Sequence, residues 1–132
     1  MELLGFSRRV SSLVNPIKLV NNMKWRYVSH KSYEPHIFVV GAPRSGTTLM
    51  FTVLNTHPAI SSIDCETFFF VPRDVFNLKS YRRLENRSNL SIEKISDFIG
   101  SSNNLIELYD KIAIQALESE NKKRFLEKTP FL

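Results

Sequence analysis

Residues 37–48 read Ile-Phe-Val-Val-Gly-Ala-Pro-Arg-Ser-Gly-Thr-Thr, an apolar run that leads directly into a glycine-containing loop. Gly41, four further residues and Gly46 have the spacing of a phosphate-binding P-loop. A glycine lets the backbone curl close to an anion, and a helix that begins after it offers unpaired N–H groups at the positive end of its dipole. The stretch therefore predicts a strand, an anion-binding loop and a helix in direct succession.

The end of this loop differs from that of nucleotide-hydrolysing P-loops. Thr47 and Thr48 stand where such loops have Lys followed by Ser or Thr. That lysine bridges the β- and γ-phosphates during phosphoryl transfer, so its absence argues against an ATPase or GTPase. A cation lies inside the loop instead, as Arg44, and a guanidinium can hold a phosphate or a sulfate through two parallel hydrogen bonds. The loop is typical of a site for a phosphate-like anion.

Three stretches, in this order, resemble the sulfotransferase family. Residues 41–50, GAPRSGTTLM, are similar to the 5′-phosphosulfate loop, and nearest to the branch of protein-tyrosine sulfotransferases and many bacterial relatives. The small-molecule branch usually has Lys at the position of Arg44. Residues 65–69 (Cys-Glu-Thr-Phe-Phe) and 127–130 (Glu-Lys-Thr-Pro) are similar to two further motifs. Together the resemblance covers residues 36–132, and three ordered motifs are more specific than one loop.

The resemblance implies a sulfotransferase that moves a sulfuryl group from 3′-phosphoadenosine 5′-phosphosulfate (PAPS) to an acceptor hydroxyl, with PAPS as the co-substrate and no metal. Lys128 would stabilise charge on the leaving phosphate. A lysine at a strand end that faces water is the alternative interpretation. The residues implied to bind the 5′-phosphosulfate are those of the loop: Arg44, Ser45, Gly46, Thr47 and Thr48.

Glu66 is the expected general base, because its Glu-Thr pair is similar to the one that carries the carboxylate base of tyrosine sulfotransferases. Residues 68–70, all Phe, would give it the apolar surroundings in which a carboxylate is a better base. The segment is one residue longer than the closest pattern, so an ordinary loop glutamate is the alternative, and Asp64 is the other candidate base.

The pattern of apolar residues predicts an α/β fold with a P-loop-type parallel sheet flanked by helices. Because ligands in such sheets sit at the carboxyl ends of the strands, residues 41–48 and 128–130 should share one edge. Residues 74–84 suggest a polar helix, and Gly100 should end a helix that Ser91 caps. The other elements expected are strands at 36–40, 60–63 and 124–128 and helices at 47–55 and 105–116.

Length and charge divide the chain into two parts. The 132 residues suffice for one small domain. The distribution of charge and the family resemblance divide them into a basic extension at 1–34 and a sulfotransferase-like part at 35–132. The extension has six basic and two acidic side chains, whereas the remainder has twelve and eleven. The near-neutral body argues against a broad nucleic-acid-binding surface. A loosely ordered extension, or a helix packed on the missing half of the domain, is favoured because Pro16 interrupts the helical pattern.

The single cysteine, Cys65, excludes an internal disulfide and favours a cytoplasmic location. The sequence shows no apolar run of bilayer-spanning length and no secretory signal pattern. The basic, acid-poor residues 1–34 leave organelle targeting or contact with a membrane surface as alternatives. The oligomeric state is not indicated by the sequence.

Two other functions fit parts of the pattern. A nucleotide kinase or NTPase remnant would bind ATP with magnesium in place of the phosphosulfate nucleotide. A non-catalytic nucleotide-binding fragment would show no dependence on Glu66 or Lys128. No match exists to the arginine and serine that bind the 3′-phosphate in the family, so the domain is expected to be truncated after about half its length. The acceptor is not indicated, and His57, in an Asn-Thr-His-Pro turn, is expected to be structural.

Overall fold

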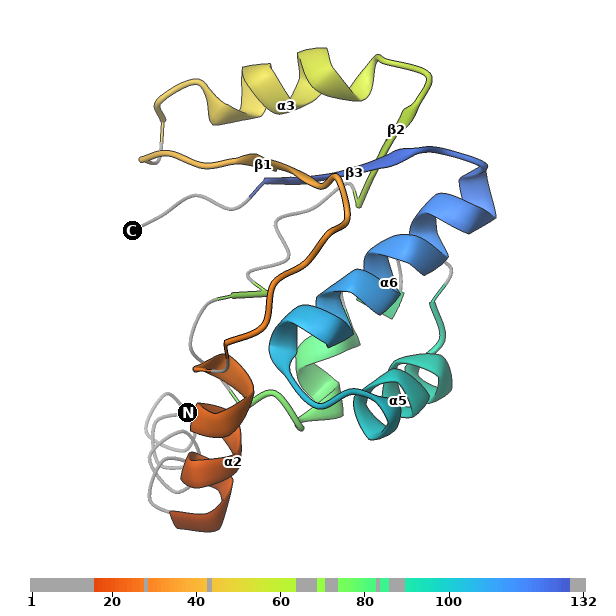
Figure 1. Cartoon of the computed structure of the whole chain (residues 1–132). Helices are drawn as coiled ribbons and strands as arrows, with labels where there is room; N and C mark the ends of the chain where they lie inside the picture. The colour runs from red at the N-terminus through yellow and green to blue at the C-terminus, as the bar shows by residue number, and fades with distance from the viewer. Residues whose placement is uncertain are drawn as a thin grey trace, which may run out of the picture.

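The structure, a computed structural model, describes residues 16–27, 29–42, 44–63, 69–70, 74–82, 84–85 and 90–128 (Figure 1). The helices and strands within these ranges are, in chain order, α2 (Pro16–Arg26), β1 (Ile37–Val39), α3 (Thr47–Asn55), β2 (Ile60–Ser62), the 3₁₀ helix η1 (Leu78–Tyr81), α5 (Ile92–Ser101), α6 (Leu105–Glu120) and β3 (Arg124–Lys128).

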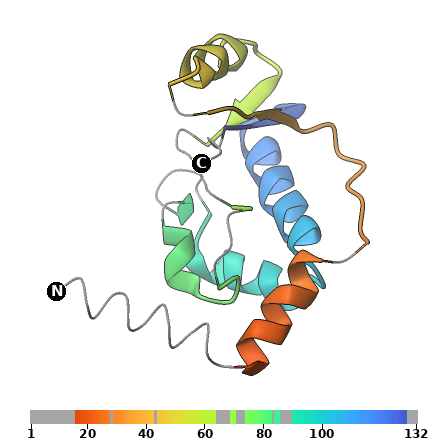
Figure 2. The same cartoon turned by 90° about the vertical axis from the view of Figure 1, so that its left-hand side faces the viewer.

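The sheet has three parallel strands in the order β1-β3-β2. Phe38 of β1 is opposite Glu127 of β3, and Ser61 of β2 is opposite Phe125. Helix α3 lies on one face of the sheet and α6 on the other, as both views show (Figures 1 and 2). The α/β class with a parallel, helix-flanked sheet is therefore confirmed, because each crossover between parallel strands carries a helix.

Side chains of β3 alternate between these two faces. The Phe125 ring contacts Tyr109 of α6 with their centroids 5.9 Å apart, whereas the Lys128 ammonium reaches Thr48 of α3. Leu126, between Phe125 and Glu127, is buried like both of them. A strand that is buried on both faces is typical of the centre of a parallel sheet.

Helix α6 supplies most of the core. Its apolar residues recur at a spacing of three and four, and they pack with Ile95 of α5 and Phe125. The Asn104 side chain caps its start by accepting a hydrogen bond from the Glu107 N–H at 2.9 Å. The buried α6 side chains are Leu105, Leu108, Tyr109, Ile112, Ala113, Ala116 and Leu117.

Several boundaries differ from the sequence prediction: β1 and β2 are shorter than expected, α6 continues to Glu120, and two further segments differ in how they end or fold. Gly100 does not end α5, which continues to Ser101 and closes when the Ser102 N–H donates to the Ile99 carbonyl. Residues 74–77 are not helical, because the Asp74 and Asn77 side chains accept from nearby backbone N–H groups and hold local turns; residues 78–81 form a 3₁₀ helix, and Arg82 and Leu84 are helical. The cap at Ser91 is confirmed, since its hydroxyl accepts from the Lys94 N–H at 3.2 Å.

Residues 16–26 form a helix, so this part of the N-terminal extension is ordered, whereas residues 1–15 lie outside the described residues. Pro16 is the first residue of α2, a position where its missing N–H costs no helical hydrogen bond. Helix α3 has the predicted bounds, but its apolar residues Leu49, Met50 and Val53 are exposed, and the buried Thr47 marks the side toward the sheet. No helix in the described part of the chain is long and apolar enough to cross a membrane.

Candidate functional site

The loop between β1 and α3 depends on both of its glycines. A Cβ atom on Gly41 would lie 2.8 Å from the Ser45 Oγ and 2.9 Å from the Thr47 Cγ2, closer than packed atoms approach. Gly46 has a φ of 89°, in the left-handed region that favours glycine. Gly41 therefore permits a close approach of the loop to itself, and Gly46 permits the turn into α3.

Arg44 lies at the turn of this loop. Its φ of 63° is also left-handed, which is uncommon for a residue with a side chain. The residue is exposed. The next residue holds the loop closed, since the Ser45 hydroxyl donates to the Ala42 carbonyl at 2.6 Å and its N–H donates to the same carbonyl at 3.2 Å. This places an exposed guanidinium in the loop that precedes α3.

The loop leads directly into the N-terminus of α3. The first helical hydrogen bond here runs from the Met50 N–H to the Gly46 carbonyl at 3.0 Å. The N–H groups before Met50 belong to the first turn, which in any helix lacks partners within the helix and carries the positive end of the dipole. Thr47 is buried, and Thr48, next to it, is exposed. The unpaired N–H groups and the positive end of the dipole make this helix start suitable for binding an anion.

Lys128 lies beside this helix start, although it is 80 residues away from Thr48 in the sequence. Its Nζ donates a hydrogen bond to the Thr48 Oγ1 at 2.8 Å. Parallel pairing of β1 and β3, with Val39 opposite Lys128, brings the ends of the two strands to one edge. The predicted proximity of the loop and Lys128 is therefore confirmed, and two cations, Arg44 and Lys128, belong to this edge of the sheet.

The face of β3 away from the loop carries a second charge. Glu127 is buried, with 4% of its surface exposed, and lies near the Tyr109 phenol on α6. Burial raises the pKa of Tyr109, and the nearby carboxylates of Glu127 and Asp110 raise it further. Tyr109 therefore stays protonated. Consecutive residues of β3 thus present an anion to the α6 layer and a cation to the α3 layer.

A buried histidine ties the start of β1 to α6. The His36 Nε2 lies 2.7 Å from the Asp110 Oδ1, and the Ser32 hydroxyl donates to the same oxygen at 2.8 Å. The His36 ring is edge-on to Tyr109, with centroids 5.2 Å apart. This arrangement anchors the segment before β1. The sequence prediction missed it because His36 and Asp110 are 74 residues apart and no local pattern pairs them.

The aromatic residues that follow the expected base lie against the same layer. Phe69 is buried, and its ring centroid lies 5.1 Å from that of Tyr109. The ring centroid of Phe70 lies 5.0 Å from that of Tyr109 and 6.1 Å from that of Phe38. These contacts bring residues 69–70 to the α6 face of the sheet beside β1. Glu66, Asp64, Cys65 and Phe68 lie outside the described residues, as do Thr129 and Pro130 of the last motif.

His57 has the structural role that the sequence predicted. Its Nδ1 accepts a hydrogen bond from the Ala59 N–H at 3.1 Å, and its carbonyl accepts from the Ile60 N–H at the same distance. It therefore shapes the turn between α3 and β2. Among the described residues, no group of three or more His, Cys, Asp or Glu side chains is placed to hold a metal ion.

The described residues also form an open cavity of about 410 Å³. It is lined by Leu78, Lys79, Arg82, Glu85 and Ile92, residues in or near η1 and at the start of α5. None of the loop residues and neither end of β1 or β3 contributes to its lining. The cavity is therefore separate from the site at the edge of the sheet.

Comparison with known proteins identifies the family of the chain. No curated protein and no solved structure matches the chain. A family model described as the sulfotransferase family matches residues 35–132, which include the loop, Lys128 and the whole sheet. On this match, the chain belongs to the sulfotransferase family.

Proposed function

We propose that this chain binds PAPS and transfers its sulfuryl group to an acceptor hydroxyl. The observation that carries the proposal is the hydrogen bond from the Lys128 Nζ to the Thr48 Oγ1, at 2.8 Å. It brings a second cation to the start of α3, where a loop with Arg44 already offers a guanidinium. Two cations beside a helix N-terminus suit a ligand with more than one negative charge.

The residues of the loop have separate roles in this proposal. The Arg44 guanidinium would hold the 5′-phosphosulfate through paired hydrogen bonds. The backbone N–H groups of Ser45 and Gly46 would donate to it, together with the hydroxyls of Thr47 and Thr48. The Lys128 ammonium would turn from Thr48 to the bridging oxygen, where negative charge develops as the phosphate leaves.

The reaction requires one bond to form and one to break. The acceptor oxygen attacks the sulfur, and the bond between the sulfur and the bridging phosphate oxygen breaks. The electron pair of that bond stays with 3′,5′-adenosine bisphosphate, and the acceptor proton passes to a carboxylate base. We assign the base to Glu66, because its motif precedes Phe69 and Phe70, which lie at the α6 face beside β1.

Calorimetric titration of the chain with 3′,5′-adenosine bisphosphate tests the binding part. Arg44→Ala and Lys128→Met should each weaken binding about tenfold or more, since hydrogen bonds to charged groups contribute about 1.5–3 kcal/mol. Arg82→Ala and Lys94→Met are matched controls, because both residues are exposed and lie outside the site. ATP with magnesium should bind more weakly than the bisphosphate. Equal affinity of all four variants, or preference for ATP with magnesium, would refute the proposal.

The catalytic part is tested by transfer of labelled sulfate from PAPS to a panel of hydroxyl acceptors. Glu66→Gln should leave bisphosphate binding unchanged and lower the rate of transfer about a hundredfold or more, as loss of a general base does. Asp64→Asn is the discriminating variant. If it abolishes transfer while Glu66→Gln does not, the base is Asp64.

A further inference from the structure

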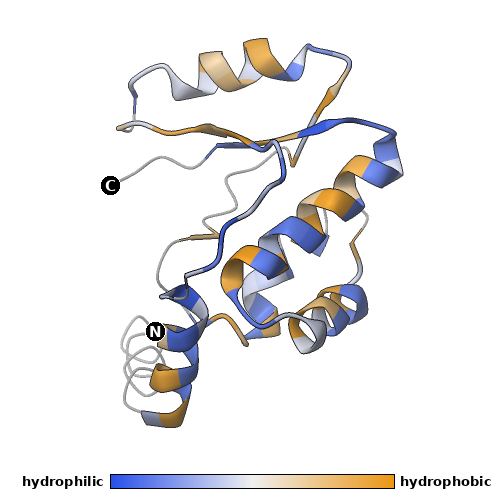
Figure 3. Ribbon diagram, viewed as in Figure 1, coloured by the Kyte–Doolittle hydropathy of each residue, from blue (hydrophilic) through white to orange (hydrophobic). Residues whose placement is uncertain are grey.

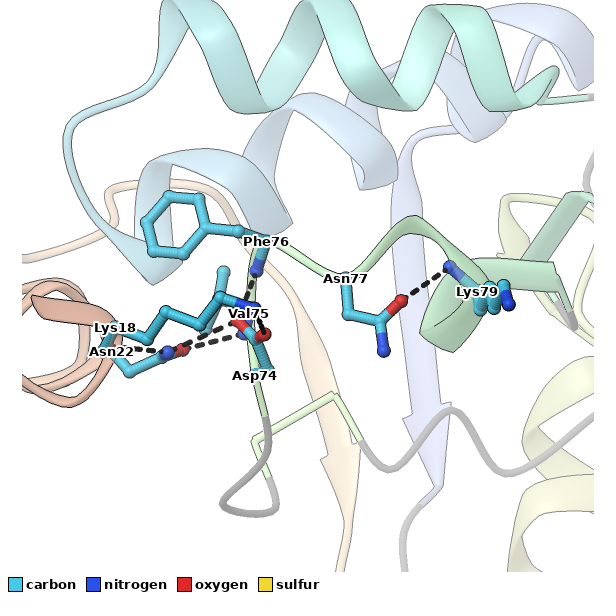
Figure 4. Close-up of polar contacts among 7 residues, drawn as sticks. All are labelled: Lys18, Asn22, Asp74, Val75, Phe76, Asn77 and Lys79. Carbon is cyan, nitrogen blue, oxygen red and sulfur yellow. Dashed lines mark hydrogen bonds and ion pairs between the residues drawn. The ribbon is translucent and has the colours of Figure 1, made fainter. Parts of the chain in front are cut away.

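Helix α2 contacts the body of the protein through polar side chains. The Asn22 side chain donates to the Asp74 Oδ1 at 3.2 Å and accepts from the Val75 N–H at 2.7 Å, as Figure 4 shows. The Lys18 Nζ lies 3.9 Å from the other carboxylate oxygen of Asp74. These contacts join the helix to a segment more than 50 residues away and fix which side of it faces inward.

Two longer side chains complete this inward side. Trp25 packs edge-on against Phe76, with ring centroids 5.0 Å apart, and the Arg26 guanidinium donates to the Phe70 carbonyl at 3.3 Å. Burial lowers the pKa of Arg26 from its ordinary value. A lysine, an asparagine and an arginine thus lie on the side that most surface helices fill with apolar residues.

Helix α2 carries hydrophobic as well as hydrophilic residues (Figure 3), and apolar side chains on the side opposite these contacts are exposed. Met23 and Val20 are about half exposed, at 50% and 48%, and Tyr27, directly after the helix, is 82% exposed. No α2 residue is buried. The exposed apolar side chains on this side, which we call the outer face, are Ile17, Val20, Met23 and Tyr27.

The charged residue of α2 on the outer face is basic, Lys24. Helix α2 contains Lys18, Lys24 and Arg26 and no acidic residue. Lys24 follows Val20 by four residues and precedes Tyr27 by three, so it lies on the same side of the helix as they do. Around this helix, residues 1–34 carry six basic and two acidic side chains. An occupant of the outer face must therefore offer apolar groups and negative charge together.

We propose that the outer face of α2 binds the surface of a membrane that contains anionic lipids. Acyl chains would take up the apolar side chains, lipid phosphates and carboxylates would pair with Lys24, and Tyr27 would lie at the boundary between them. Helices α2 and α3 lie at opposite ends of the molecule in both views (Figures 1 and 2). A helix docked in this way leaves the loop before α3 accessible from water.

Flotation of the purified chain with vesicles tests this proposal. Vesicles of phosphatidylcholine with 30 mol% phosphatidylserine, a composition of about the charge of an anionic leaflet, should float the chain, and phosphatidylcholine alone should not. The double variant Val20→Ser with Met23→Ser should lower the partition coefficient about tenfold or more, because it removes apolar area from the contact. Lys24→Gln should lower it about fivefold on the anionic vesicles.

The matched control removes apolar area of the same kind from the other end of the molecule. Leu49→Ser with Val53→Ser changes two α3 side chains that are 70% and 58% exposed, and it should leave partitioning unchanged. Circular dichroism should show equal helix content for all variants, since each replaced side chain is exposed.

Three results would overturn the proposal. The first is failure of the wild-type chain to float with anionic vesicles, and the second is equal flotation of wild type and the Val20/Met23 variant. The third is a concentration-dependent dimer, without flotation, that the same two serines dissociate, which would assign the outer face to a second copy of the chain. None of these results depends on PAPS, so they are independent of the proposed function.

Discussion

The loop before α3 makes a strong prediction for Gly41→Ala. The new methyl group would lie 2.8 Å from the Ser45 Oγ and 2.9 Å from the Thr47 Cγ2. Both neighbours are constrained, because the Ser45 hydroxyl donates to the Ala42 carbonyl at 2.6 Å and Thr47 is buried. The methyl group therefore cannot be accommodated without a change in the loop.

The cost has two parts. Rotation of the Ser45 side chain breaks its hydrogen bond, which contributes about 1 kcal/mol. Displacement of Thr47 is an overpacking of a buried position, for which about 1–3 kcal/mol is usual. We expect Gly41→Ala to lower the free energy of unfolding by about 2–4 kcal/mol. In a Ser45→Ala background only the Thr47 contact remains, so the same change should cost about 1 kcal/mol less.

Urea unfolding followed by circular dichroism measures these differences, with Gly100→Ala as the matched control. Gly100 lies inside α5 and a Cβ there meets no atom within 4 Å. Its replacement should raise the free energy of unfolding by about 0.5–1 kcal/mol, since alanine is the better helix former. If Gly41→Ala is as stable as wild type while Gly100→Ala is stabilised, the packing described for the loop is incorrect.

Two further predictions follow from contacts of β3 and α6. A double-mutant cycle of Lys128→Met and Thr48→Val should give a coupling energy of about 0.5–1.5 kcal/mol in urea unfolding, and a value of zero would contradict the hydrogen bond between them. Tyr109 has a pKa in the folded state above its unfolded value of about 10. Its contribution to the free energy of unfolding is therefore complete below pH 10 and is lost as the pH rises further. The free energy of unfolding of the wild type should therefore fall by about 1.4 kcal/mol by pH 11, and that of Tyr109→Phe should not. An equal dependence of the free energy of unfolding on pH in the two proteins would contradict the raised pKa.

The elements nearest the site could be predicted from the sequence because local patterns specify them. A run of apolar residues before Gly41 predicts a buried strand; the strand β1 is present, but it lies at an edge of the sheet with Phe38 47% exposed. Residues 47–55 and 124–128 have the predicted bounds. The proximity of Lys128 to the loop then follows from parallel pairing alone, since both lie after strands of one sheet. The parallel sheet thus brings the loop before α3 and Lys128, which are far apart in the sequence, to one candidate site.

Features that depend on distant partners could not be predicted in the same way. Asn22 weakens an isolated helix, yet here it bonds to Asp74 and Val75, 52 and 53 residues away, and so helps to hold α2 in place. The apolar residues Leu49, Met50 and Val53 of α3 are exposed, because helical periodicity does not say which side of a helix meets the sheet. Gly100 was expected to end α5, but a glycine ends a helix only where the backbone turns left-handed, and the structure places no such turn at Gly100.

The register of β3 decides which charge faces the loop. Glu127 and Lys128 are neighbours, and successive side chains of a strand point to opposite faces, so the carboxylate lies toward α6 and the ammonium toward α3. A slip of one residue would exchange them, and a carboxylate would then repel the anion for which the loop is suited. The same slip would turn Phe125 away from Tyr109 and break the packing against α6. Hydrophobic burial on one face of the sheet therefore fixes the electrostatics on the other, because both depend on the pairing of Val39 with Lys128.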